Sequence, residues 1–223
     1  ASIATVSAYA AYLVAANLLL NTSVVHSLAN RQPEKFVASW NSAWSLYPGH
    51  FSARGVTLAG HVRHMVWSVQ AETVRGRVAL LPLVTKAVRV PSIVATGVTG
   101  GATRIDAERV PPPPRPGGWT LRFDGVVADD VRYAYFNDLV LQGNGRAEAG
   151  FVKTLRGGAM EVLPSQVHFE SGDVWRDGSK LAWDAGVEAT FAIAAHLREE
   201  APGIRKLEKA DVEIEVNAVT AGL

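Results

Sequence analysis

The sequence predicts a mainly β protein in which an N-terminal transmembrane helix and a short helix precede an elongated, curved antiparallel β-sheet that forms a groove. Three observations carry this prediction. The first 30 residues contain no charged side chain, so all 22 Lys and Arg and all 21 Asp and Glu lie after them. From residue 51 onward, apolar residues alternate with polar ones, as in strands. Turn-forming dipeptides separate these stretches in the second half.

Residues 1–22 are predicted to form the transmembrane helix. Residues 3–20 are an uncharged stretch of 18 residues, close to the ~20 that cross the hydrocarbon core of a bilayer. The stretch carries small residues on which another helix can pack closely, namely Ala4, Ser7, Ala8 and Ala11. The alternatives are an uncleaved signal peptide or interfacial helix, and a helix buried in the protein core.

Residues 23–48 are predicted to form a juxtamembrane helical segment. Phe36, Trp40 and Trp44 recur every four residues and would share one face of a helix. Trp40 and Trp44 are therefore assigned to the membrane interface, where indole rings are favoured. Packing of these rings against the following domain is an equal alternative.

The remaining chain is divided into two β-rich parts and a linker. Residues 49–110 form the first part, and residues 119–223 form an antiparallel meander. Between them, residues 111–118 are proline-rich and favour a stiff polyproline linker. Turns in the meander are expected at residues 124–125, 144–145, 157–158 and 177–178.

One long predicted strand, residues 181–195, carries the candidate groove facing lipid or a partner. Its apolar residues alternate with polar ones such as Asp184 and Glu188, so one face is apolar. That face needs a cover, which helices, a second sheet, a partner or lipid could provide. The residues assigned to the groove are Leu181, Trp183, Val187, Phe191 and Ile193.

Residue types and spacings provide no catalytic signature. His61 and His64, three apart in a predicted strand, would point to opposite faces and make a poor metal pair. The chain has no Cys, which excludes disulfides and thiolate sites. The sequence therefore predicts no enzyme activity, no catalytic or metal-binding residue and no cofactor. Basic residues are not interleaved with aromatic ones, which argues against a nucleic-acid partner.

Charge differs between the two halves of the chain. Residues 31–110 contain ten Lys and Arg against four Asp and Glu, whereas residues 111–223 contain twelve against seventeen. The half next to the predicted membrane helix is therefore basic, which suits anionic lipid headgroups or an acidic partner surface.

Several short segments occur in a recognisable order after the uncharged N-terminus. They are LANRQPEK at 28–35, WNSAWSLYPG at 40–49, RGVTLAG at 54–60, FDGV at 123–126 and GNG at 143–145. In this order the chain resembles the N-terminal part of AsmA-like envelope proteins of Gram-negative bacteria. The resemblance implies an inner-membrane anchor and a periplasmic body. It further implies a U-shaped β-sheet with an apolar groove, as in bridge-like lipid-transfer proteins.

Two functions follow as expectations. The first is a non-enzymatic, single-pass, membrane-anchored β-rich protein that handles lipid or supports the envelope through its groove. The second is an accessory structural subunit that stabilises a larger photosynthetic or respiratory membrane complex. The expected partners are membrane lipid and other transmembrane subunits. The expected location is the bacterial inner membrane, with the body in the periplasm.

Overall fold

The computed structural model describes most of the chain. Backbone is described for residues 2–22, 27, 30–31, 33, 36–62, 65–105, 117–155, 160–199 and 205–221. Side chains are described for the same residues except 2–4, 62, 160 and 193–221.

The described chain contains one α-helix, ten strands and one 3-10 helix. In chain order these are α1 (Ser2–Leu20), β1 (Phe36–Ser39), β2 (Ser42–Trp44), β3 (His50–Val62), β4 (Met65–Ala79), η1 (Leu81–Thr85), β5 (Ala87–Arg104), β6 (Thr120–Phe136), β7 (Leu139–Thr154), β8 (Met160–Arg176), β9 (Ser179–Glu199) and β10 (Arg205–Ala221).

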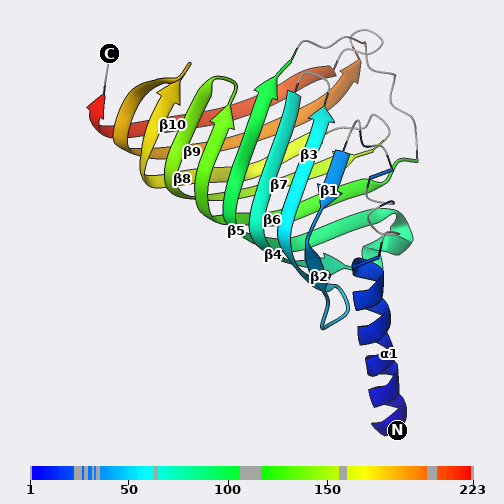
Figure 1. Cartoon of the computed structure of the whole chain (residues 1–223). Coiled ribbons are helices and arrows are strands. Elements are labelled where there is room, and N and C mark those ends of the chain that lie inside the picture. The colour runs from blue at the N-terminus through cyan, green and yellow to red at the C-terminus, as the bar shows by residue number, and fades with distance from the viewer. Residues whose placement is uncertain are drawn as a thin grey trace.

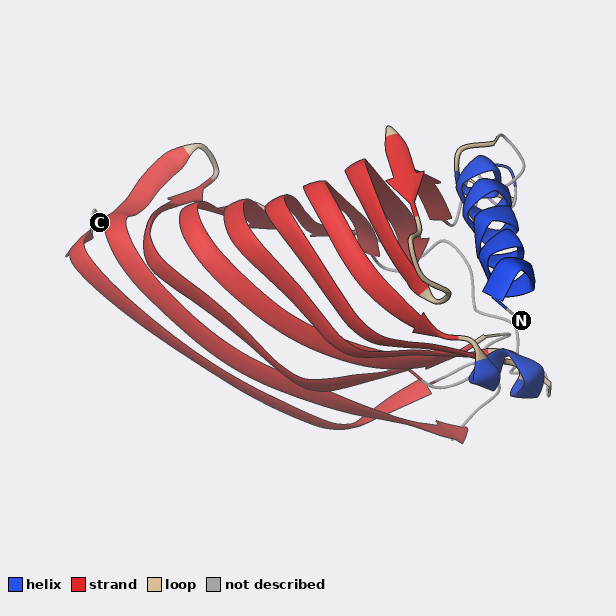
Figure 2. Cartoon of the chain, turned by 90° about the horizontal axis from the view of Figure 1, so that it is seen from below, coloured by secondary structure: helices blue, strands red, loops and turns tan. Residues whose placement is uncertain are grey.

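All ten strands belong to one sheet, which bends along the direction of its strands (Figures 1 and 2). The strand order is β1-β3-β4-β5-β6-β7-β8-β9-β10, and β2 pairs with β3 beside β1. The prediction of a mainly β chain with an elongated, curved sheet is confirmed. The two predicted β-rich parts are portions of this one sheet.

One pair of neighbouring strands departs from the predicted antiparallel arrangement. β5 and β6 are parallel, with Ala87 opposite Thr120. A hairpin cannot join parallel strands, because the chain must return to the same end of the sheet. The segment between Arg104 and Thr120 makes this return. Most of the predicted linker 111–118 falls in it, and residues 111–116 lie outside the described residues.

The N-terminal helix forms as predicted, but the membrane span is not supported. Among the described residues, no helix is long and apolar enough to cross a membrane. The 19 residues of α1 include Ser, Thr, Tyr and Asn beside many small alanines, which lowers their mean hydropathy. The helix ends where the Thr22 hydroxyl donates to the Leu19 carbonyl oxygen at 2.8 Å.

The predicted juxtamembrane helix 23–48 is wrong over its described second half. Phe36–Ser39 and Ser42–Trp44 are short strands that pair with β3. The four-residue aromatic period arises from two strands and a bend, since Trp40 lies between β1 and β2. The ring centroids of Phe36 and Trp67 lie 6.2 Å apart.

Three asparagine side chains cover the outer edges of β1 and β2. Asn17 of α1 donates to and accepts from Ser45, and Asn21, directly after α1, does the same with Ala43, at 2.6–3.1 Å. Asn30 pairs in the same way with Ala38, at 2.7 and 2.9 Å. Four residues of helix rise about 6 Å, and two residues of strand about 6.7 Å. The Asn17–Asn21 spacing therefore matches alternate residues of the edge.

We predict that replacing both Asn17 and Asn21 with Ala exposes this edge. The backbone amides of Ala43 and Ser45 lose their acceptors, and each lost hydrogen bond costs about 1 kcal/mol. Hydrogen exchange at these two amides is expected to accelerate. Ser7→Ala, on an exposed position of the same helix, serves as the control. Unchanged exchange in the double variant would contradict this role of the asparagines.

Candidate functional site

The inner, concave side of the bent sheet carries a continuous row of apolar residues, one from each central strand. Ala71 lies opposite Val98, Val98 opposite Val131, and Val131 opposite Gly145. Gly145 in turn lies opposite Phe169, and Phe169 opposite Val187. We call these six residues from β4 to β9 the apolar ladder. Residues in register share a face, so the ladder crosses the sheet at right angles to its strands.

A second row lies beside the ladder and is made of small residues. It runs through Val74, Ala95, Ala128, Ala147, Val167 and Ala189. Several of its members pack against the buried cluster around Phe169, but they remain partly exposed. Within the described residues α1 contacts β2 and η1 contacts β5, and neither forms a layer over the ladder.

Phe169 is the anchor of this face. It is 1% exposed and is the largest fully buried side chain among the described residues. Its ring lies flat over Gly145, where an added Cβ would come within 2.7 Å of ring carbons. A side chain at residue 145 would therefore displace the ring from its position between β7 and β9.

Residues with positive φ keep the apolar positions of neighbouring strands on one face. Ala128 and Val131 both pack in the cluster although they are three residues apart, a spacing that places side chains on opposite faces of a regular strand. Asp130 lies between them with φ 55°. Gly97, with φ 64°, has the same place between Ala95 and Val98 on β5.

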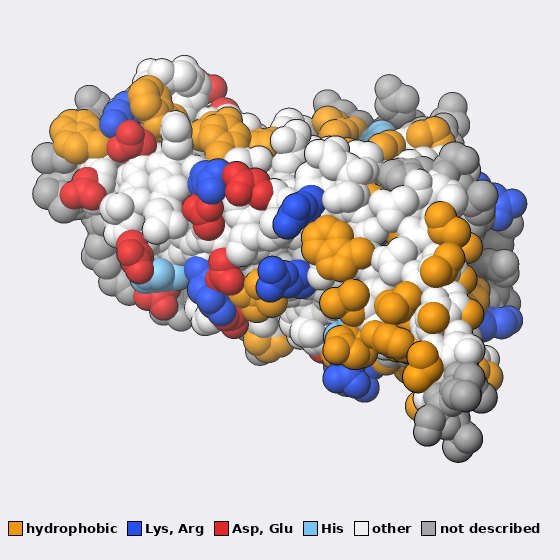
Figure 3. All heavy atoms as spheres, turned by 60° about the horizontal axis from the view of Figure 1, so that its bottom comes forward, with side chains coloured by type: hydrophobic (Ala, Val, Ile, Leu, Met, Phe, Trp, Pro, Cys, Tyr) orange, Lys and Arg blue, Asp and Glu red, His pale blue; other side chains and the backbone are white. Residues whose placement is uncertain are grey.

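The opposite, convex face is charged at the level of these kinks. Arg132 of β6 pairs with Glu72 of β4 at 2.6 Å and with Asp130 at 2.5 Å. Arg146 of β7 pairs with Asp129 at 2.6 Å. These exposed pairs keep the convex face hydrated and mark it as the side facing water. Figure 3 shows charged side chains of both signs gathered on the outer side of the bend.

One carboxylate holds the parallel pair β5–β6 together. Asp124 of β6 accepts a hydrogen bond from Arg89 of β5 at 2.7 Å and another from Arg122. Burial by itself raises the pKa of Asp124, but the two guanidinium groups outweigh it and hold the pKa below its ordinary value. The ion pair therefore persists in moderately acidic solution.

A polar hollow of about 450 Å³ opens on the far half of the sheet. Within it, Lys180 and Asp173 form an ion pair at 2.6 Å. Lys180 also lies 5.4 Å from the centre of the Trp175 ring, and the buried Trp175 Nε1 has no hydrogen-bond partner among the described residues. The hollow is lined by Gln142, Gly143, Asn144, Ser171, Gly172, Asp173, Lys180, Trp183 and Asp184. These groups can bind a polar molecule.

The structure divides the residues assigned to the groove. Val187 packs against the buried cluster, and Phe191, four residues further along β9, is partly buried on the same face. Trp183 is 41% exposed and lines the polar hollow instead. Leu181 lies two residues before Trp183 in β9 and therefore shares the face of Trp183, whereas Ala182 between them is buried. Ile193 lies in β9, and its side chain is outside the described ones.

The cause of this division is Asp184, whose φ is 53°. Ala182 and Ala185, on either side of it, are both buried, at 7% and 0% exposed. The side chains before and after Asp184 therefore do not follow one regular alternation between the two faces of the sheet. The sequence pattern of β9 did not indicate this change. The residues that dominate the apolar face, Phe169 among them, were not selected from the sequence because they become neighbours only through the strand register.

The residues assigned to the membrane lie at one corner of the sheet. Ser7, Ala8 and Ala11 are exposed on α1, and the side chain of Ala4 is outside the described ones. The other two are the tryptophans. Trp40 donates from Nε1 to the Leu20 carbonyl oxygen at 3.0 Å, and the guanidinium of Arg54 lies 5.3 Å above the ring of Trp44.

Comparison with known proteins finds no family model that matches the chain and no curated protein that matches its sequence. The resemblance to AsmA-like proteins, and the membrane lipid and transmembrane partners that it implies, stay predictions. Among the described residues, no three His, Cys, Asp or Glu side chains lie close enough to hold a metal ion.

Gly145→Ala is expected to destabilise the protein by about 1–3 kcal/mol, because the new methyl group overpacks against the Phe169 ring. Gly125→Ala is a matched control within β6, since a Cβ there approaches only the Pro91 carbonyl oxygen, at 3.6 Å. Urea unfolding measures both free energies. Combining Gly145→Ala with Phe169→Leu should cost less than the sum of the single changes. Equal effects of the two glycine substitutions would contradict the role of Gly145.

The Asp124 ion pair predicts a pH dependence of stability. Because the pKa of Asp124 is lower in the folded protein, its contribution is present above the unfolded-state pKa and is lost as pH falls through the folded-state pKa. Asp124→Asn should lower the free energy of unfolding at pH 7 by less than about 1 kcal/mol. The difference from the unsubstituted protein should shrink as the pH falls below the ordinary carboxyl pKa of about 4. Urea titrations over this range test it, with Asp177→Asn as the control.

Proposed function

We propose that this protein is a non-enzymatic lipid-handling protein of the bacterial envelope whose concave sheet face shields acyl chains from water. The observation that supports the proposal is the row of small residues beside the apolar ladder, which is partly exposed and has no covering layer among the described residues. Apolar surface in contact with water is costly, and burying a methylene group against it gains about 0.8 kcal/mol. An acyl chain supplies such groups in a row.

The dimensions of the ladder suit this ligand. Neighbouring strands lie about 4.8 Å apart, so the ladder from β4 to β9 is roughly 24 Å long. One leaflet of a bilayer core is about 15 Å thick, half of the ~30 Å total. The ladder therefore has the length to accompany a whole acyl chain. Its Ala, Gly and Val side chains leave room for that chain, which a row of large side chains would fill.

Photocrosslinking tests this proposal with two adjacent positions of β9. Val187 belongs to the ladder, whereas Glu188 is exposed on the other face, opposite His168. Benzoylphenylalanine placed at residue 187 is expected to form phospholipid adducts when the protein is irradiated with lipid, and the same group at residue 188 is not. Mass spectrometry detects the adducts.

Two results would reject the lipid-handling proposal. One is equal lipid labelling at residues 187 and 188, which would indicate contact without use of the concave face. The other is a purified protein that carries no lipid in native mass spectrometry and takes none from vesicles.

A further inference from the structure

Large apolar side chains lie exposed where α1, the turn between β2 and β3, and η1 meet. Leu81 and Val84 of η1 are 87% and 86% exposed, the highest values among the described large apolar residues. We call the set of Val14, Leu18, Leu46, Tyr47, Leu81 and Val84 the apolar corner. Figure 3 shows hydrophobic side chains gathered over this end of the molecule. Exposed apolar surface of this extent marks an interaction site.

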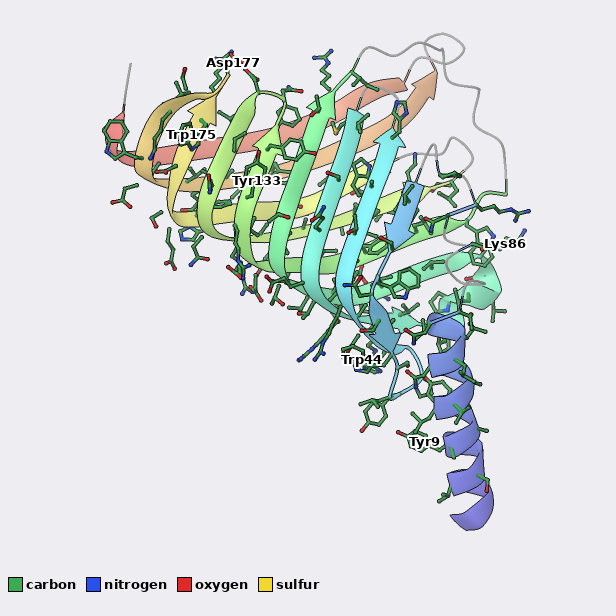
Figure 4. All side chains as sticks on the ribbon, viewed as in Figure 1. Tyr9, Trp44, Lys86, Tyr133, Trp175 and Asp177 are labelled. Atoms are coloured by element: carbon green, nitrogen blue, oxygen red, sulfur yellow. The ribbon has the colours of Figure 1, made fainter. Side chains whose placement is uncertain are left out.

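Hydrogen bonds tie the turn between β2 and β3 to α1 and to the end of β4, which leads into η1. Tyr9 of α1 donates its hydroxyl to the Leu46 carbonyl oxygen at 3.0 Å. The Val78 amide donates to the Gly49 carbonyl oxygen at 2.6 Å, which fixes the turn to the end of β4 just before η1. Figure 4 shows Tyr9 and Trp44 at this corner, with Trp175 at the other end of the sheet. The corner is therefore one surface.

Basic residues flank the apolar corner. Arg75 and Arg77 of β4 lie opposite Ser52 and His50, next to the turn, and both are exposed. Lys86 directly follows η1 and is exposed. Within described residues 2–105 the only acidic side chain is Glu72, which pairs with Arg132. The described residues of these N-terminal segments therefore carry more positive than negative charge.

We propose that the apolar corner docks on the surface of an anionic phospholipid bilayer. In this arrangement α1 lies in the interface with Val14 and Leu18 toward the acyl chains, and Leu81 and Val84 insert beside it. Exposed apolar side chains with basic residues beside them provide both attractions that hold a protein at the surface of an anionic membrane. Arg75, Arg77 and Lys86 attract anionic headgroups. The proposal uses no residue of the apolar ladder and does not depend on the proposed function.

Cosedimentation of the full chain with vesicles tests the docking. The probe is phosphatidylcholine alone or mixed with phosphatidylglycerol, and binding to the anionic mixture is expected to be stronger. Leu81→Asp combined with Val84→Asp should weaken binding to it at least tenfold. Leu139→Asp, at an exposed apolar residue on the β6–β7 hairpin, is the control and should bind unchanged. Because Leu81 and Val84 are nearly fully exposed, the double variant is expected to keep the β-sheet circular dichroism spectrum.

The basic residues are tested separately from the apolar ones. Arg75→Gln and Arg77→Gln should each weaken binding to anionic vesicles about fivefold and leave binding to neutral vesicles unchanged. Raising the salt concentration should reduce the effect of these substitutions, because it screens the attraction.

Three outcomes would overturn the docking proposal. The protein could fail to bind anionic vesicles, or it could bind them equally well with and without Leu81→Asp and Val84→Asp. It could also form a lipid-free dimer that the double variant separates, in which case the corner is covered by a second copy of the chain. Loss of vesicle docking with retained lipid labelling at residue 187 would leave the proposed function standing.

Discussion

The organisation of the molecule depends on the alternation of side chains across a sheet that no second layer covers among the described residues. In a two-layer protein, an apolar face is buried by its partner layer, whereas the described part of this chain provides no such layer. The ladder around Phe169 therefore sits on the concave side, where the bend of the sheet brings its own side chains together. The charged pairs of Arg132 and Arg146 occupy the convex side. Residues such as Asp130 preserve this separation, since their positive φ shifts the alternation between strands.

The two edges of the sheet are treated differently. Asn17, Asn21 and Asn30 supply donors and acceptors to the backbone of Ser45, Ala43 and Ala38 along the edge of β1 and β2, and so occupy groups that a further strand would use there. Unpaired strand edges invite pairing with other chains, and side-chain amides are an effective cover because they reproduce the geometry of the backbone. No described strand pairs with the outer edge of β10.

The sequence predicted the curved sheet and the turn at Asp177–Gly178, where both residues have positive φ. It did not predict the places where glycine and aspartate act inside strands. Asn-Gly at 144–145 resembles a hairpin turn, yet both residues lie within β7. The glycine at residue 145 serves packing, since the Phe169 ring occupies the space that a side chain would take. Asp184 likewise turns Trp183 away from the face of Val187. Both effects depend on strands distant in sequence, so a local pattern cannot contain them.

The apolar corner lies near the end of the sheet at which the apolar ladder begins. The ladder crosses the strands, so its direction runs from the β3–β4 end of the sheet toward β9. Helix α1 and its contacts with β2 lie at the first end of that direction. A bilayer that binds the corner would face the beginning of the ladder rather than its side. An acyl chain drawn out of that bilayer would pass from one apolar surface to the next, so that few methylene groups would be exposed to water at any step.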